Sequence, residues 1–173
     1  MTTFIALLRA VNVGGTGKLP MAELKAICSD AGFVRVQTYI ASGNVVFESK
    51  ASAAKVKSEL EARLLAYGGK PIGVVVRTAS EMAAVLKANP FTTAAPNHTL
   101  AIFLDVPPPS DALEKAVGVN GEEIHLGARE IFVHYGAGMA RSKLRIPAAK
   151  AGTARNMNTV AKLAEIASKL SGL

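Results

Sequence analysis

Apolar residues in this sequence form a few continuous runs, separated by segments in which they recur every three or four positions. The first run, residues 3–11, is almost entirely apolar, a pattern typical of a central strand that is buried on both faces. A segment with helical spacing lies between Pro20 and Gly32, and strand-like runs over 33–39 and 44–48 follow it. A short glycine-containing loop predicts a hairpin between these two runs. The order up to this point is β-α-β-β.

Two further segments complete the first half of the chain. Ser52 is placed to cap a helix that extends to about Tyr67, and Gly68-Gly69 ends it. Residues 71–77 are again strand-like. Residues 1–77 therefore have the order β-α-β-β-α-β, which is the order of a ferredoxin-like unit.

The pattern then repeats in outline. We predict a helix over about 81–88, capped by Thr78 or Ser80, and an apolar strand over 99–106. A short helix near Asp111 to Val117 follows, and then two paired strands over 122–126 and 130–135.

The last part of the chain predicts two helices. Pro147 opens a short one that ends by Gly152, and an amphipathic helix starts at about Asn156. The apolar stripe of the final helix consists of Met157, Val160, Leu163, Ala164, Ala167 and Leu170. We expect an α+β fold of two intertwined ferredoxin-like halves, 1–77 and 78–173, with a C-terminal basic amphipathic helix. The halves would share one core in a single compact unit over 1–173.

Positive charge gathers near the end of the sequence. The 173 residues carry a formal net charge of +7. From residue 139 onward seven basic residues stand against one acidic residue, Glu165, which gives +6 there and +1 over residues 1–138. Such asymmetry suits a phosphate-bearing partner, and a solvated basic surface would give the same count. The seven are Arg141, Lys143, Arg145, Lys150, Arg155, Lys162 and Lys169.

Cysteine usage and hydropathy indicate the compartment. Cys28 is the single cysteine and lies on the apolar face of a predicted helix, which favours a packed thiol over a nucleophile. No apolar window is long enough to span a bilayer, and no basic segment followed by an apolar run stands at the start. We expect a soluble cytoplasmic protein without membrane contact.

The turn after the first strand, residues 9–18, is the first candidate binding site. Its glycines let the backbone approach a ligand closely, and its polar and cationic side chains precede a helix N-terminus, where anions are favoured. A tight structural turn would have the same composition. The candidate ligand-binding residues in the turn are Arg9, Asn12, Gly14, Gly15 and Lys18.

This turn differs from a nucleotide phosphate loop. The pattern G-x-x-x-x-G-K-[ST] would require glycine in place of Asn12 and a hydroxyl residue in place of Leu19. Because the magnesium ligand is missing, we predict anion binding without a metal ion.

Two other polar clusters are candidates. Residues 153–159 place two asparagines, two threonines and an arginine before the final helix, where they can cap the backbone or hold a ligand. The hairpin tip Ser42-Gly43-Asn44 suits a turn, and Asn44 could present its amide beside the first turn.

Catalytic and metal-binding patterns are weak. The three histidines are dispersed, without ligand spacing on a shared helix. Glu122 and Glu123 would point to opposite faces of a strand, and Ser42 and Ser142 have no base beside them in the sequence. The sequence therefore predicts no metal, no cofactor and no identifiable reaction.

Five segments carry a family resemblance. They are Leu7-Leu8-Arg9-Ala10-Val11-Asn12-Val13-Gly14-Gly15, Thr38-Tyr39-Ile40-Ala41-Ser42-Gly43-Asn44-Val45-Val46-Phe47, Asn89-Pro90-Phe91, Gly138-Met139-Ala140-Arg141-Ser142-Lys143-Leu144 and Thr153-Ala154-Arg155-Asn156-Met157-Asn158-Thr159-Val160. At these residues the chain resembles the bacterial family called domain of unknown function 1697. The family commonly has tryptophan where Met157 stands, so a stacking role is not carried over, and often glycine where Ala10 stands.

The resemblance implies the same fold of two intertwined ferredoxin-like halves, and it implies no activity. It marks polar positions that coincide with the clusters chosen on chemical grounds, which favours one composite site or a shared structural network. The marked positions are Arg9, Asn12, Gly14, Gly15, Ser42, Asn44, Ser142, Lys143, Arg155, Asn156 and Asn158.

We therefore expect a metal-independent binding module for a phosphate-bearing small ligand or nucleotide. Lys143 and Arg155 would add positive charge to the first turn, and backbone N–H groups would bind the phosphate. One alternative is an enzyme of unknown reaction that uses the same basic pocket. Another is a protein that binds nucleic acid or acts by interaction or dimerisation. Extended nucleic acid is less favoured because no aromatic residue follows Tyr135.

Overall fold

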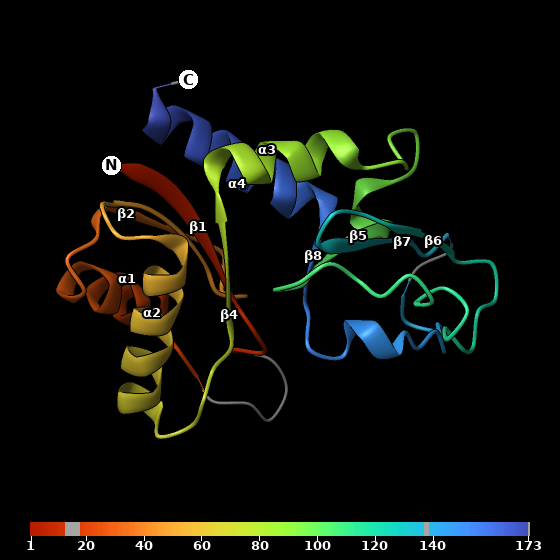
Figure 1. The fold of residues 1–173 in the computed structure, drawn as a ribbon, viewed down its shortest axis with the longest axis horizontal. Coiled ribbons are helices and arrows are strands. Elements are labelled where there is room, and N and C mark those ends of the chain that lie inside the picture. The colour runs from red at the N-terminus through yellow and green to blue at the C-terminus, as the bar shows by residue number, and fades with distance from the viewer. Residues whose placement is uncertain (13–17, 137–138, 173) are drawn as a thin grey trace. The chain divides into compact units, whose positions relative to one another are not determined.

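Four helices and eight strands make up the part of the chain that the computed structural model describes, residues 1–12, 18–136 and 139–172 (Figure 1). Two short 3-10 helices, η1 (Pro96–His98) and η2 (Pro147–Ala149), accompany them. The elements are β1 (Thr2–Leu8), α1 (Met21–Asp30), β2 (Val34–Tyr39), β3 (Asn44–Ser49), α2 (Ala53–Gly68), β4 (Val74–Thr78), α3 (Ala79–Ala88), β5 (Thr99–Phe103), β6 (Glu123–Leu126), β7 (Glu130–His134), β8 (Thr153–Asn156) and α4 (Met157–Ser171).

The strands form two four-stranded antiparallel sheets, β2-β3-β1-β4 and β6-β7-β5-β8. In both sheets the first strand along the chain lies between the third and the fourth, so the two strand orders are equivalent. The structure is therefore a mixed α+β fold, as the sequence predicts. The chain divides into unit 1, Met1–Ala83 with Lys162–Leu173, and unit 2, Ala84–Ala161. That the halves form one compact unit stays a prediction.

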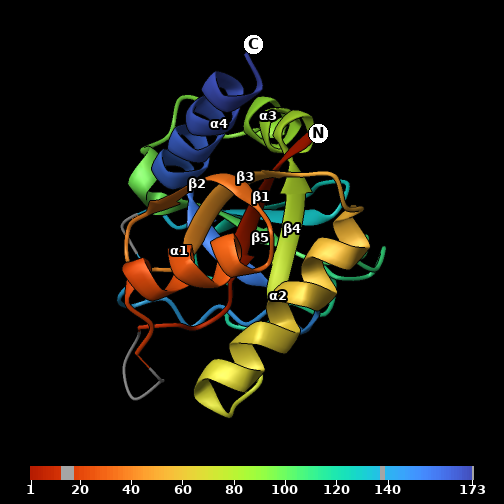
Figure 2. The ribbon, with the colours of Figure 1, turned by 90° about the vertical axis from the view of Figure 1, so that its left-hand side faces the viewer.

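In unit 1, β1 is a central strand with both faces buried. It pairs with β3 on one side and β4 on the other, and six of its seven residues are buried. Figure 2 shows α1 and α2 together on one face of this sheet. Alternate residues such as Phe4 and Ala6 enter the core beneath these helices, and Ile5 and Leu7 are buried on the other face. The continuous apolar run is thus explained by two-sided burial.

Local capping fixes the helix ends. Ser52 Oγ accepts a hydrogen bond from Lys55 N–H at the start of α2, and Gly69 ends the helix with φ 72°. At the start of α3, Thr78 Oγ1 accepts from Glu81 N–H while Glu81 Oε1 accepts from Thr78 N–H. This reciprocal pair is a capping box, so Thr78 is the cap among the two predicted candidates.

The β2–β3 hairpin requires glycine at position 43. Gly43 has φ 90°, and a Cβ there would lie 2.7 Å from Val11 Cγ2 and 2.9 Å from Leu8 Cβ. Its carbonyl accepts a 2.8 Å hydrogen bond from Leu8 N–H. The hairpin tip therefore packs directly on the last residues of β1.

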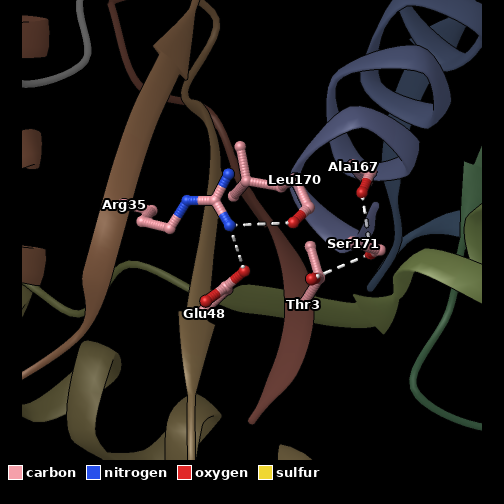
Figure 3. A network of polar contacts seen from close by, with 6 residues as sticks. All are labelled: Thr3, Arg35, Glu48, Ala167, Leu170 and Ser171. Atoms are coloured by element: carbon pink, nitrogen blue, oxygen red, sulfur yellow. Dashed lines mark hydrogen bonds and ion pairs between the residues drawn. The ribbon is translucent and has the colours of Figure 1, made fainter. Parts of the chain in front are cut away.

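A bulge in β2 connects the sheet of unit 1 to the end of α4 (Figure 3). Arg35 lies at the register shift with φ 53°, and its Nη1 donates to Glu48 Oε1 at 2.9 Å and to the Leu170 carbonyl at 3.0 Å. Beside it, Ser171 Oγ bonds to Thr3 Oγ1 at 2.9 Å. A guanidinium at a helix C-terminus satisfies a free carbonyl and complements the helix dipole.

Unit 2 has its own apolar core. Ile102 on β5 and Ile131 and Val133 on β7 are its buried centre, and Ile146 packs with them from the loop before η2. Buried residues also form the predicted stripe of α4. Only two of the seven C-terminal basic residues, Lys162 and Lys169, lie in this helix, and both pair with Glu165.

Two predicted elements differ from the structure, and one strand of the structure was not predicted. β1 ends at Leu8 instead of residue 11, because Ala10 has a left-handed backbone with φ 53°. Residues 110–115 form hydrogen-bonded turns instead of the helix near Asp111 to Val117; the segment is short, and Val117 pairs with Arg145 instead. The sequence also missed β8, whose four residues are mostly polar and join the sheet through their backbone to β5.

Substitutions of two glycines test the packing of the hairpin. Gly43→Ala should lower the free energy of unfolding by about 2–4 kcal/mol, because it combines left-handed strain with overpacking. Gly32 is the matched control, since its φ of 89° is almost the same and nothing lies within 4 Å of the added Cβ. Gly32→Ala should cost only about 1 kcal/mol. Equal losses in urea denaturation would contradict the close approach at Gly43.

Candidate functional site

A pocket of about 530 Å³ lies in unit 1 beyond the end of β1. Three chain segments line it: residues 9–11 directly after β1, residues 18–19 before α1, and residues 67–73 at the end of α2 and in the loop before β4. We call it the β1-end pocket. The pocket therefore includes residues from both ends of the 9–18 turn, which is the first candidate site in the sequence.

The backbone at the end of β1 leaves the sheet abruptly. Arg9 N–H makes a 3.0 Å hydrogen bond to the Gly73 carbonyl, and Ala10 and Asn12 then adopt φ values of 53° and 55°. A left-handed conformation costs a non-glycine residue about 1–2 kcal/mol, which accounts for glycine being common at position 10 in the family that the sequence resembles. This turn places the exposed Arg9 side chain in the pocket wall.

The Asn12 side chain holds both ends of the turn together. Its Oδ1 accepts from Leu19 N–H at 2.7 Å, and its Nδ2 donates to the carbonyls of Leu19 at 2.7 Å and Ala41 at 2.9 Å. The side-chain amide of Asn12 thus hydrogen-bonds to three backbone groups. In this structure Asn12 positions the turn, whereas the sequence suggested that it orients a ligand.

Positive charge and apolar surface meet in the β1-end pocket. Arg9, Lys18 and Lys70 lie exposed in its lining, and no acidic side chain is among the described residues there. Within the described parts of the chain, neither Lys18 nor Lys70 forms an ion pair. Tyr67, 47% exposed, adds an aromatic ring, and the buried Leu19 adds apolar surface. Such a lining can hold an anion that carries an apolar or aromatic group.

Four other predicted binding residues belong to this turn or to the hairpin tip that the sequence placed beside it. Gly14 and Gly15 lie outside the described residues. Asn44 is fully buried, and its Nδ2 donates to the Tyr39 carbonyl and to Ser42 Oγ, both at 2.9 Å. Asn44 and Ser42 therefore stabilise the hairpin tip, which in turn packs on β1.

Unit 2 contains a second cavity, of about 600 Å³. It lies between residues 118–122, residues 135–136 at the end of β7, and residues 141–143. The predicted ligands Ser142 and Lys143 line it, together with Tyr135 and Glu122. We call it the Glu122 pocket.

Hydrogen bonds hold the Glu122 carboxylate in this cavity. Ser142 Oγ donates to Oε1 at 2.6 Å, and Asn120 N–H donates to Oε2 at 2.5 Å. The Ser142 hydroxyl, followed by the backbone N–H, lowers the pKa of Glu122. Burial, and secondly the charge of Glu122, raises the pKa of Tyr135. At neutral pH the pocket therefore holds an ionised carboxylate near a protonated phenol.

The remaining predicted ligands lie around the start of α4. Arg155 on β8 is buried, its Nη1 donates to the Ala154 carbonyl, and burial lowers its pKa to about 10, which leaves it charged at neutral pH. Asn156 Oδ1 accepts from Thr159 N–H at 3.0 Å and so caps the helix, whereas Asn158 is exposed. Capping is thus observed at Asn156.

Metal and thiol chemistry have little basis in the described residues. Within them no group of three or more His, Cys, Asp or Glu side chains is arranged to hold a metal ion. Cys28 is completely buried in the core of unit 1, and burial raises its pKa to about 12, so the thiol is inert. In the same parts of the chain no helix has the length and apolar character needed to cross a membrane.

Sequence reasoning missed several residues that line the two pockets, among them Tyr67, Lys70, Glu122, Tyr135 and Arg141. Tyr67 and Lys70 follow Arg9 by more than fifty positions, and no local pattern links them. The run of basic residues after position 139 was a usable signal for Arg141. Glu122 was considered only as half of a catalytic pair.

The fold and the two pockets define a mixed α+β protein with separate basic cavities in its two units. The model of the family "Protein of unknown function (DUF1697)" matches residues 1–132, and the chain belongs to this family. The match confirms the resemblance seen in the sequence. The resembling segments 138–144 and 153–160 lie beyond it.

One solved structure agrees closely with the fold. It is described as the structure of conserved bacterial protein SP0830 from Streptococcus pneumoniae. The alignment has a TM-score of 0.78 and 24% sequence identity, and it covers 96% of this chain and 98% of that one. At this identity the likeness establishes the fold. A search of curated proteins found no significant match.

Ser142 can be tested as the group that holds Glu122. Ser142→Ala should raise the pKa of Glu122 towards its ordinary value, as measured by NMR titration of its side-chain carboxyl carbon. Because the native pKa is lowered, the wild type gains stability above the unfolded-state pKa and loses it as the pH falls through the native pKa. Ser142→Ala should show a smaller loss over that acidic range. An unchanged Glu122 titration would exclude the Ser142 hydroxyl as the main cause.

Proposed function

We propose that the protein binds a small phosphate-bearing ligand, such as a nucleotide, in the β1-end pocket and without a metal ion. The observation that carries this proposal is the meeting of Arg9, Lys18 and Lys70 in one pocket whose described lining is free of acidic side chains. Three cations around a cavity favour a multiply charged anion, because each can make a charge-assisted hydrogen bond.

The apolar part of the pocket favours an organic phosphate over a bare ion. Tyr67 offers a half-exposed ring beside the cations, and Pro71 and Ile72 add apolar surface. The volume of about 530 Å³ suits a ligand of nucleotide size. A mononucleotide would place its phosphate by the cations and its base against the ring.

The proposal also covers three expectations from the sequence: the ferredoxin-like halves, the compartment and the extent of the site. The equivalent strand orders of the two sheets support ferredoxin-like halves, with turns and η2 in place of helices in the second half. The buried, unpaired Cys28 suits a reducing compartment and hence the cytoplasm. The joining of Lys143 and Arg155 to the same site stays a prediction.

Binding can be tested with AMP, inorganic phosphate and adenosine. AMP should bind and raise the melting temperature, while adenosine should bind at least tenfold more weakly because it lacks the charge. Lys70→Glu should weaken AMP binding by at least about tenfold, and added salt should weaken it in the wild type.

Lys55→Glu is the matched control. Lys55 is exposed in the first turn of the same helix whose last residues line the pocket, so it gives the same charge change away from the site. It should leave AMP binding unchanged. Equal AMP affinity in wild type and Lys70→Glu, or adenosine that binds as tightly as AMP, would refute the proposal.

A further inference from the structure

A regular row of cations runs along residues 141–145 of unit 2, outside the site proposed above. Arg141, Lys143 and Arg145 are exposed, and the two residues between them are half-buried. Ser142 bonds to Glu122, and Leu144 packs on the core of unit 2. Because the inward residues are anchored, the three cations face outward together. We call this segment the 141–145 strip.

The strip is held in place by its neighbours. Val117 and Arg145 exchange two backbone hydrogen bonds, of 2.9 and 2.8 Å. Gly118 follows with φ 74°, and any Cβ there would collide with the Lys143 carbonyl. These contacts therefore hold the backbone that carries the three cationic side chains in place.

The spacing of the cations suits a chain of phosphates. Lys143 and Arg145 follow the turn that contains Arg141, and alternate residues of extended backbone are about 6.6 Å apart, since each residue advances about 3.3 Å. Successive phosphates of an extended nucleic-acid strand are separated by a distance of the same order. Within the described residues none of the three cations forms an ion pair, so their charge is available to a partner.

The Glu122 pocket adjoins the strip and has features that suit an unpaired base. Arg141 and Lys143 belong to both, so a strand on the strip would pass the cavity. Tyr135 lies in its wall and packs on the core, which holds the ring in position for stacking.

The Glu122 carboxylate gives the cavity a chemical preference. The carboxylate accepts hydrogen bonds from the Ser142 hydroxyl and from the backbone N–H groups of Asn120 and Glu122, and its two oxygens together offer about four acceptor sites, so acceptor capacity is left for a ligand. A carboxylate accepts hydrogen bonds and does not donate them, so it favours an exocyclic amino group such as that of cytosine. Thymine has no amino group, and its N3–H donor lies between two carbonyl oxygens that the carboxylate repels.

We propose that unit 2 binds single-stranded nucleic acid along the 141–145 strip, with a base that bears an amino group in the Glu122 pocket. A paired base is stacked within the duplex and could not enter the cavity and lie against Tyr135, so the site favours a single strand. This interaction is separate from the small-ligand site in unit 1.

The phosphate contacts can be tested by fluorescence anisotropy with labelled oligo(dC) of about ten nucleotides. Three contacts predict a slope of about −2 for log K against log salt, and Arg141→Ala/Lys143→Ala should reduce it to about −0.7. Arg141→Glu/Lys143→Glu should abolish binding. Oligo(rC) should bind similarly if phosphates dominate.

Lys25→Glu/Lys55→Glu is the matched control, because both lysines are exposed on helices of unit 1 and the net charge changes equally. It should bind as the wild type does, as should Lys70→Glu, which separates this surface from the small-ligand site. If the control pair and the strip pair lose affinity equally, binding follows net charge alone and the proposal is wrong.

The base contact has its own test. Wild type should prefer oligo(dC) to oligo(dT) by about tenfold, and Glu122→Gln, whose amide can donate to thymine, should remove most of that preference. Tyr135→Phe should retain binding, whereas Tyr135→Leu should weaken it by about fivefold or more through lost stacking. Equal affinity of wild type for oligo(dC) and oligo(dT) would overturn the role of Glu122. Cooperative thermal unfolding of each variant confirms that it is folded.

Discussion

The geometry of the β1-end pocket depends on one side-chain amide. Asn12 hydrogen-bonds to both backbone groups of Leu19 and to the carbonyl of Ala41, so it joins the end of β1, the start of α1 and the β2–β3 hairpin. The chain leaves β1 through left-handed residues that are unfavourable in isolation. The hydrogen bonds of the Asn12 side chain offset that cost. Arg9 and Lys18 then line the same cavity.

The tip of the β2–β3 hairpin also packs against the end of β1. Gly43 approaches Leu8 and Val11 so closely that no side chain fits at position 43. The side chain of Asn44 hydrogen-bonds within the hairpin tip, to Tyr39 and Ser42. The polar residues that surround the pocket are thus divided between two tasks. The side-chain amides of Asn12 and Asn44 hydrogen-bond to backbone groups, whose burial without a partner would be costly, and the long cationic side chains of the pocket remain exposed.

Unit 2 uses polar groups differently. Its carboxylate, Glu122, is fixed by Ser142 and a backbone N–H, and this bond also anchors one inward residue of the cationic strip. In the interaction proposed for unit 2, the charge of the carboxylate therefore contributes to both its placement and its selectivity. A cavity with cations alone would attract any phosphate, whereas a fixed acceptor beside them distinguishes one base edge from another.

Apolar spacing and capping chemistry in the sequence determined the α+β class, the strand and helix order of unit 1, the helix cap at Ser52 and the central place of β1, because both act over a few neighbouring residues. They left Thr78 and Ser80 as alternative caps of α3. The composition of the first turn made Arg9 and Lys18 candidate binding residues. The tertiary structure decided what depends on long-range pairing: β8, whose polar residues join the sheet through their backbone, and the approach of Tyr67 and Lys70 to the first turn. Those contacts arise only when α2 and β4 pack beside β1, and no local pattern in the sequence encodes them.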